Sequence, residues 1–246
     1  MEKQAYRLTF FVVTIVCCFA TKANYKSDIY KAFITGDMQR WKQVMVQMDN
    51  NKTKQPAYIL ELVNYQYGYI AWCIGNKMED EAEEYLKKAD ENIEFLEKLK
   101  YDLSMVYAYK AAFYGYRIGI NIYKAPFYGP KSYNYAEDAI ASDKNNAFAY
   151  LQYANIQFYM PSAFGGSKKE AIEYFTKAEK LMEQDVKQTV GDWNYLNLLT
   201  TIANSYNEIK QPEIAKSYFE KILKIEPDYE WVKNNLYPKL LIDLKQ

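Results

Sequence analysis

The chain has 246 residues, half of them apolar, a length that suffices for one large domain or for an array of small units around a continuous core. Its 31 Lys and Arg residues equal its 31 Asp and Glu residues in number, so no overall field attracts nucleic acid or an anionic membrane. The sequence contains no histidine, which excludes His-based catalytic triads, His metal sites and the commonest general base.

Residues 1–23 have the layout of a signal peptide. Lys3 and Arg7 lie near the start, the run from 8 to 20 is uncharged, and small residues follow where a signal peptidase cleaves. The uncharged run is too short to span a bilayer comfortably. We therefore predict cleavage near Ala23 and an exported protein, either periplasmic or secreted.

Two other fates compete with cleavage. An uncleaved run would anchor the protein in a membrane. Cys17 or Cys18 could instead carry a lipid, but neither follows the small residue that a lipoprotein signal requires. Cleavage would leave Cys73 without a partner for an internal disulfide, and a lone cysteine in an aromatic helical segment predicts a buried, inert thiol.

Residues 24–246 are predicted to form a single domain of paired helices. The pairs are expected at approximately 26–52, 57–100, 102–143, 147–184 and 196–227, followed by a capping helix at 229–245. In the clearest pair, Ala203 and Tyr206 precede Ala215, Phe219 and Ile222 at helical spacing. Small residues at the crossing points let two helices approach closely, and a short pair must stack on its neighbours to bury its apolar face.

Two turns inside these pairs are expected to be enlarged. In the fourth pair, Pro161 ends the first helix, Gly165 and Gly166 allow positive φ, and Ser167 caps the second helix. A second long turn is expected at 124–132, where proline and glycine also gather.

The recurring small and aromatic residues resemble the tetratricopeptide repeat (TPR) family, and the resemblance covers most of the chain after residue 23. It implies an all-α fold in which tetratricopeptide-like helical hairpins form a right-handed superhelix with a C-terminal capping helix. A plain helical bundle is the competing fold, but a bundle does not need this set of residues to recur at this period.

The same resemblance implies which residues face the concave surface, because set positions of each first helix line it in that family. On this sequence they predict a binding groove that is aromatic in its middle and amide-rich towards its C-terminal end. The candidate residues are Tyr65, Tyr69, Trp72, Tyr109, Tyr116, Phe148, Leu151, Asn155, Phe158 and Asn204. The competing interpretation is that these rings pack against neighbouring repeats. The groove positions carry no row of Lys or Arg, which argues against a carboxylate clamp.

A short element formed by Pro161, Phe164, Gly165, Gly166 and Ala171 is similar to one in the periplasmic T component of TRAP-type transporters (TatT-like). That resemblance implies a small hydrophobic ligand, although this chain lacks that family's clear lipoprotein cysteine.

These observations predict an exported, non-catalytic binding or scaffold protein for a protein partner or an apolar ligand, with a periplasmic transport accessory as the alternative. We expect no cofactor, no metal site and no nucleic-acid partner. Membrane contact is expected only through an uncleaved or lipidated signal. A hydrolase is the least favoured class, because the chain lacks histidine.

Overall fold

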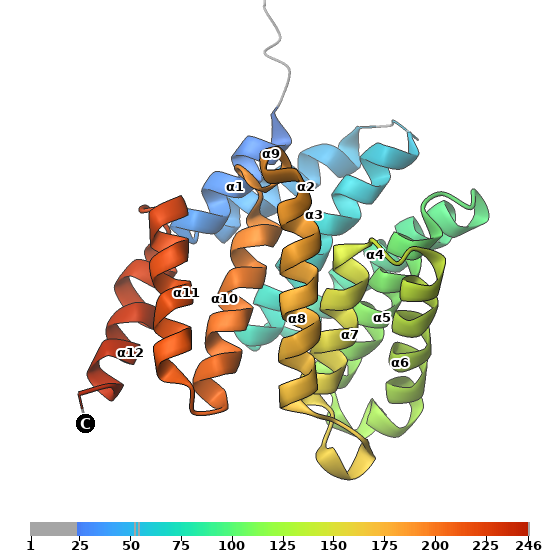
Figure 1. Cartoon of the computed structure of the whole chain (residues 1–246). Coiled ribbons are helices and arrows are strands. Elements are labelled where there is room, and N and C mark those ends of the chain that lie inside the picture. The colour runs from blue at the N-terminus through green and yellow to red at the C-terminus, as the bar shows by residue number, and fades with distance from the viewer. Residues whose placement is uncertain (1–23, 52, 54, 246) are drawn as a thin grey trace, which may run out of the picture.

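The computed structural model describes residues 24–51, 53 and 55–245. The predicted signal peptide lies outside these residues. Every regular element in the described part of the chain is helical, and Figure 1 shows the helices stacked side by side. The predicted all-α helical repeat fold is confirmed.

The helices follow one another in packed pairs, each joined by a short connection. The pairs are α1 (Tyr25–Thr35) with α2 (Met38–Asn50), α3 (Pro56–Gly75) with α4 (Glu79–Lys98), α5 (Leu103–Ile120) with α6 (Ala125–Ser142), α7 (Ala147–Tyr159) with α8 (Lys168–Met182), and α10 (Trp193–Glu208) with α11 (Pro212–Ile225). A short helix, α9 (Val186–Thr189), precedes the last pair, and α12 (Tyr237–Asp243) follows it.

Capping side chains fix where several of these helices begin. Asn24, Asp37 and Asn146 accept hydrogen bonds from backbone N–H groups of α1, α2 and α7, and Asp102 and Asp192 do the same for α5 and α10. Such a cap pairs an amide that the helix leaves free and contributes ~1 kcal/mol. Because the starting points are fixed, the residues of each first turn are positioned as well.

Small residues lie where the helices of a pair cross, as the sequence pattern indicated. Phe175 of α8 and Phe219 of α11 are buried in the clusters that these crossings form. The fully buried alanines are Ala82, Ala89, Ala108, Ala136, Ala139, Ala149, Ala154, Ala171, Ala178, Ala203 and Ala215. Their small volume allows the close approach that brings the aromatic rings into contact with the neighbouring helix.

The long turn predicted at 124–132 is wrong. A 3-10 turn covers Ile122–Lys124, and α6 begins at Ala125 and continues through this stretch. Pro126 lies in the first turn of α6, where its missing N–H has no intrahelical partner. The amide that Pro130 lacks would have bonded to the carbonyl of Pro126, so the helix loses a single bond near its start.

The connection between α7 and α8 contains two glycines, Gly165 and Gly166, that are needed for different reasons. α7 ends before Pro161, Gly165 has a φ of 97°, and Ser167 caps α8, all as predicted. Gly166 does not have positive φ. Instead, a Cβ at Gly166 would lie 1.8 Å from the carbonyl oxygen of Met160. The close approach of two backbone segments, and not a dihedral angle, therefore requires glycine at this position.

The N-terminal pair packs against the C-terminal part of the array, and Figure 1 shows α1 and α2 (blue) close to α10. The ring of Trp193, at the start of α10, lies 4.9 Å from Trp41 of α2 and 5.7 Å from Phe33 of α1, measured between ring centroids. Phe33 also packs on Tyr229 at 5.0 Å. We call these four residues the aromatic junction. It joins the two ends of the array.

The segment after α11 covers the last pair. Val232 and Leu240 are buried in the same cluster as Phe219. A π-helical turn, Val232–Leu236, leads into α12, and Pro238 lies in the first turn of α12. Pro238 thus follows a π-helical turn, where the regular α-helical hydrogen-bond ladder is already interrupted.

Candidate functional site

A pocket of about 470 Å³ lies where the first turns of α3, α5, α7 and α10 converge. This volume is within the range of small-molecule sites. Each of the four helices contributes residues near its own N-terminus, and the end of α8 and the short α9 complete the wall. The pocket therefore depends on how the pairs stack and on the capping side chains that set the starts of α5, α7 and α10.

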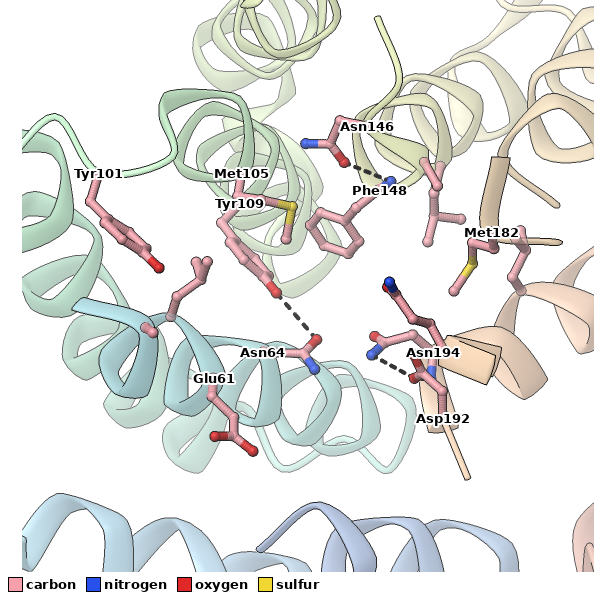
Figure 2. Close-up of a pocket in the computed structure, with 16 residues that line it drawn as sticks. Glu61, Asn64, Tyr101, Met105, Tyr109, Asn146, Phe148, Met182, Asp192 and Asn194 are labelled. Atoms are coloured by element: carbon pink, nitrogen blue, oxygen red, sulfur yellow. Dashed lines mark hydrogen bonds between the residues drawn. The ribbon is translucent and has the colours of Figure 1, made fainter. Parts of the chain in front are cut away.

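Six residues of the pocket lining are Leu, Met or Phe. They are Leu60, Met105, Phe148, Leu151, Met182 and Leu198. Figure 2 shows Phe148 between the thioethers of Met105 and Met182. The Phe148 ring also packs on Tyr109 with centroids 4.6 Å apart. Flexible thioethers beside a fixed aromatic ring form a surface that adapts to an apolar ligand.

Other lining residues are polar and already partly hydrogen-bonded, as the dashed lines in Figure 2 indicate. The Tyr109 hydroxyl donates to Asn64 Oδ1 at 3.2 Å. Asp192 Oδ1 accepts from the Asn194 backbone N–H at 2.8 Å and from Asn194 Nδ2 at 3.1 Å. At the rim, Asn146 Oδ1 accepts from backbone N–H groups of α7. These bonds hold the polar groups in fixed positions.

The charged groups of the pocket are carboxylates. Glu61 and Asp192 line it, and none of the described residues that line it is Lys or Arg. Glu61 Oε1 accepts from the Tyr65 hydroxyl. Burial, with further contributions from Tyr67 and the Asp192 charge, raises the pKa of Tyr109 well above its ordinary value, so this phenol stays protonated at neutral pH.

Three of the predicted site residues, Tyr109, Phe148 and Leu151, line this pocket. Tyr65, Tyr69 and Phe158 are buried in the core. The Tyr69 hydroxyl, for example, donates to Glu81 of α4 at 2.8 Å. The prediction that these three residues face an open groove is corrected: they pack between helices, as the competing interpretation had it.

The remaining predicted residues, Trp72, Tyr116, Asn155 and Asn204, are partly buried and lie outside the pocket lining. Tyr116 stacks on Tyr67 at 5.4 Å, and Asn155 donates to Gln152. The family register placed these residues by their position along each helix. In this chain the pocket-facing residues are concentrated in the first two turns of each first helix, so residues further along have other neighbours.

Sequence reasoning missed Asn64, Met105, Met182, Asp192 and Asn194. A signal for one of them was present, because Asp192 directly precedes the helical pattern and is a typical capping residue. The others could not be placed, since their convergence depends on the curvature of the array.

Cys73 is the free cysteine among the residues that the structure describes. Burial raises the pKa of the Cys73 thiol to about 12, so the thiol is protonated and unreactive at neutral pH. Within residues 24–51 and 55–245, no cluster of Cys, Asp or Glu has the arrangement of a metal site. No helix in this part of the chain combines the length and apolar character needed to cross a membrane.

Comparisons with known proteins agree with the fold. Residues 196–229, which span most of α10 and α11, match the family model of the tetratricopeptide repeat. A comparison with curated proteins finds no match.

Two solved structures have similar folds. One is the HusA haemophore from Porphyromonas gingivalis, with a TM-score of 0.58 and 16% identity, covering 74% of this chain and 94% of that one. The other is a thermophilic TPR protein of Thermus thermophilus, with a TM-score of 0.57 and 13% identity, covering 89% of this chain and 99% of that one. At such low identity the likeness shows the fold alone. The resemblance to the TRAP-associated T component stays a prediction.

Proposed function

Because this chain folds as a tetratricopeptide-type helical repeat, we propose that it is an exported, non-catalytic binding protein whose pocket holds a small apolar ligand. The observation that carries the proposal is the pocket itself: four first helices converge on about 470 Å³ bordered by Phe148, two methionines and a few fixed amides. The TPR fold supports a binding role in general. A neighbour named a haemophore supports ligand carriage, although its identity to this chain is 16%.

A small ligand fits this site better than a peptide. The predicted groove along the array is largely filled by the rings of the protein itself, such as Tyr65 and Tyr69. The pocket lies at the first turns of four helices and does not run along the array. A clamp for a peptide carboxyl terminus would need Lys or Arg, which the described lining lacks. A protein partner would therefore have to bind another surface.

Export and a role as a transport accessory are parts of this proposal that rest on the sequence. A carrier in an exported compartment would release its ligand to a membrane or soluble component. In the transport-accessory role the protein would bind the same class of ligand in this pocket and would also dock with a transport component. Both roles therefore need the pocket, which is the feature to test first.

Binding is tested with the mature chain, residues 24–246. Native mass spectrometry should detect a retained ligand, and the neutral fluorophore N-phenyl-1-naphthylamine should bind the emptied protein with an increase in emission. Met105→Trp places a larger side chain in the pocket and should weaken fluorophore binding by at least ~10-fold.

Phe127→Ala is the matched control, because Phe127 is 75% exposed on α6 and does not line the pocket. It should bind the fluorophore as the wild type does. Circular dichroism of both variants separates loss of binding from loss of fold. Equal binding by the wild type and a folded Met105→Trp variant would contradict the proposal.

A further inference from the structure

The charge of the pocket differs from that of the whole chain. Positive and negative side chains balance overall, but among the described lining residues the charged ones are Glu61 and Asp192. Neither carboxylate forms an ion pair with any described Lys or Arg. A half-buried carboxylate without a counter-ion loses hydration, and the hydrogen bonds from Tyr65 and Asn194 replace it without neutralising the charge. A positively charged ligand group would supply the missing partner.

Asp192 is placed to receive such a group. Its Oδ1 accepts both hydrogen bonds from Asn194, and no bond within the described residues involves its Oδ2. Figure 2 shows Asp192 and Asn194 grouped with Asn64. The aromatic faces of Tyr109 and Phe148 border the same volume, and aromatic faces attract cations.

The converging helix N-termini do not reverse this preference. Each carries about half a positive charge, which on its own favours an anion. Some amides of these first turns are already engaged, however: Asn146 accepts from two N–H groups of α7, and Asp192 accepts from one of α10. A ligand carboxylate would therefore find those amides already taken and would meet the negative charge of Asp192.

We infer that the ligand is an amphiphilic cation, with an apolar body against Phe148, Met105 and Met182 and an ammonium-type group at Asp192. This inference rests on the proposed function, because it names the ligand class of the same pocket. It also excludes the anionic amphiphiles, such as fatty acids, that an apolar pocket alone would admit.

The test compares three ligands that share one alkyl chain: octylamine, octanol and octanoate, each displacing N-phenyl-1-naphthylamine. The wild type should bind the ammonium at least ~10-fold more tightly than the alcohol, and the carboxylate most weakly. The preference should shrink as salt concentration rises, because ions screen the carboxylates.

Asp192→Asn removes the charge and keeps a good helix cap, so the variant should fold, bind octanol as before and lose the ~10-fold preference for octylamine. Asp102→Asn is the matched control. Asp102 also caps a helix, α5, but it is exposed and does not line the pocket, so the preference should be unchanged.

The outcomes separate the two proposals. Similar affinities for all three ligands, or tightest binding of octanoate, would overturn the cation inference while the pocket remains a ligand site. Retention of the preference in Asp192→Asn would also overturn it. Failure of the neutral fluorophore and of all three ligands to bind would overturn the proposed function and, with it, this inference.

Discussion

The indole of Trp193 lies directly on the backbone of Gly68. A Cβ at position 68 would be 2.7 Å from Trp193 Cη2 and 2.7 Å from Trp41 Cζ2. Glycine at this point of α3 thus admits two indoles, one from each end of the array, and completes the aromatic junction.

Gly68→Ala is expected to destabilise the protein. Displacing two buried indoles costs ~1–3 kcal/mol, which outweighs the ~1 kcal/mol that alanine contributes inside a helix. We expect a net loss of up to ~2 kcal/mol in urea unfolding. Gly129→Ala is the control, because Gly129 lies inside α6 and nothing lies within 4 Å of its Cβ position. It should stabilise the protein, and equal effects of the two variants would contradict the close packing.

Gly166→Ala should damage the connection between α7 and α8 more than Gly165→Ala does. The new methyl group of Gly166→Ala would collide with the Met160 carbonyl, so the backbone must move. At Gly165, φ is 97° but nothing lies within 4 Å, so alanine meets only backbone strain of ~1–2 kcal/mol. Thermal unfolding of the two variants gives the order, and the reverse order would refute the explanation.

Tyr30→Phe should loosen the contact between the two ends of the array. The Tyr30 hydroxyl donates to Glu226 at 2.8 Å, across 196 positions of sequence. We expect a loss of ~1 kcal/mol, because the bond involves a charged acceptor but is partly exposed. Tyr123→Phe removes a hydroxyl from a side chain that is 87% exposed and should change the free energy of unfolding by less than ~0.5 kcal/mol.

Glu81 should make stability depend on pH in the acid range. Its hydrogen bond from the Lys42 ammonium, with a further one from Tyr69, holds the pKa of Glu81 below its ordinary value. A lowered pKa stabilises the fold above the pKa of the unfolded chain, and this contribution disappears as pH falls through the folded-state pKa. Glu81→Gln should therefore be less stable than the wild type at pH 7, by ~1 kcal/mol because Lys42 is partly exposed.

The difference between Glu81→Gln and the wild type should narrow between pH 5 and pH 3, which urea unfolding at several pH values measures. Glu84→Gln provides the comparison. Glu84 pairs with Lys88 at the surface, and its side chain is 62% exposed. Its removal should have little effect at any pH. A pH-independent difference for Glu81→Gln would contradict the assigned pKa shift.

Export is tested by expressing residues 1–246 in a Gram-negative host and measuring the intact mass of the product. Removal of the segment before Asn24 is expected. A full-length mass in the membrane fraction would support the anchor instead, and a mass increase at Cys17 or Cys18 would support lipidation.

The helix pairs could be predicted because the residue spacing that forms each helix face is local in the sequence. Ala171, Phe175 and Ala178 fall on one face of one helix, and this spacing can be read without knowing what packs there. The proline and glycine content of 124–132 was misleading for a related reason: Pro126 is compatible with a helix start, and composition alone does not distinguish a start from a turn.

The pocket could not be predicted in the same way. Asn64 and Asp192 are 128 positions apart, and their proximity depends on the stacking of every pair between them. Tyr65 was assigned to the groove from a family register, but a one-residue step along α3 separates it from Asn64, and this step turns a side chain by about 100°. A pattern of small and aromatic residues predicts which faces of two paired helices are in contact. It does not predict which neighbouring residue of a helix, Asn64 or Tyr65, faces the pocket.

An open array of repeats can lengthen by duplication of a unit, because each unit needs contacts only with its neighbours. In this chain Phe33 of the first pair and Trp193 of the last are in contact, so an inserted unit would separate them. The aromatic junction therefore constrains the number of units. Adding or removing a repeat would break the contact between the first and last pairs.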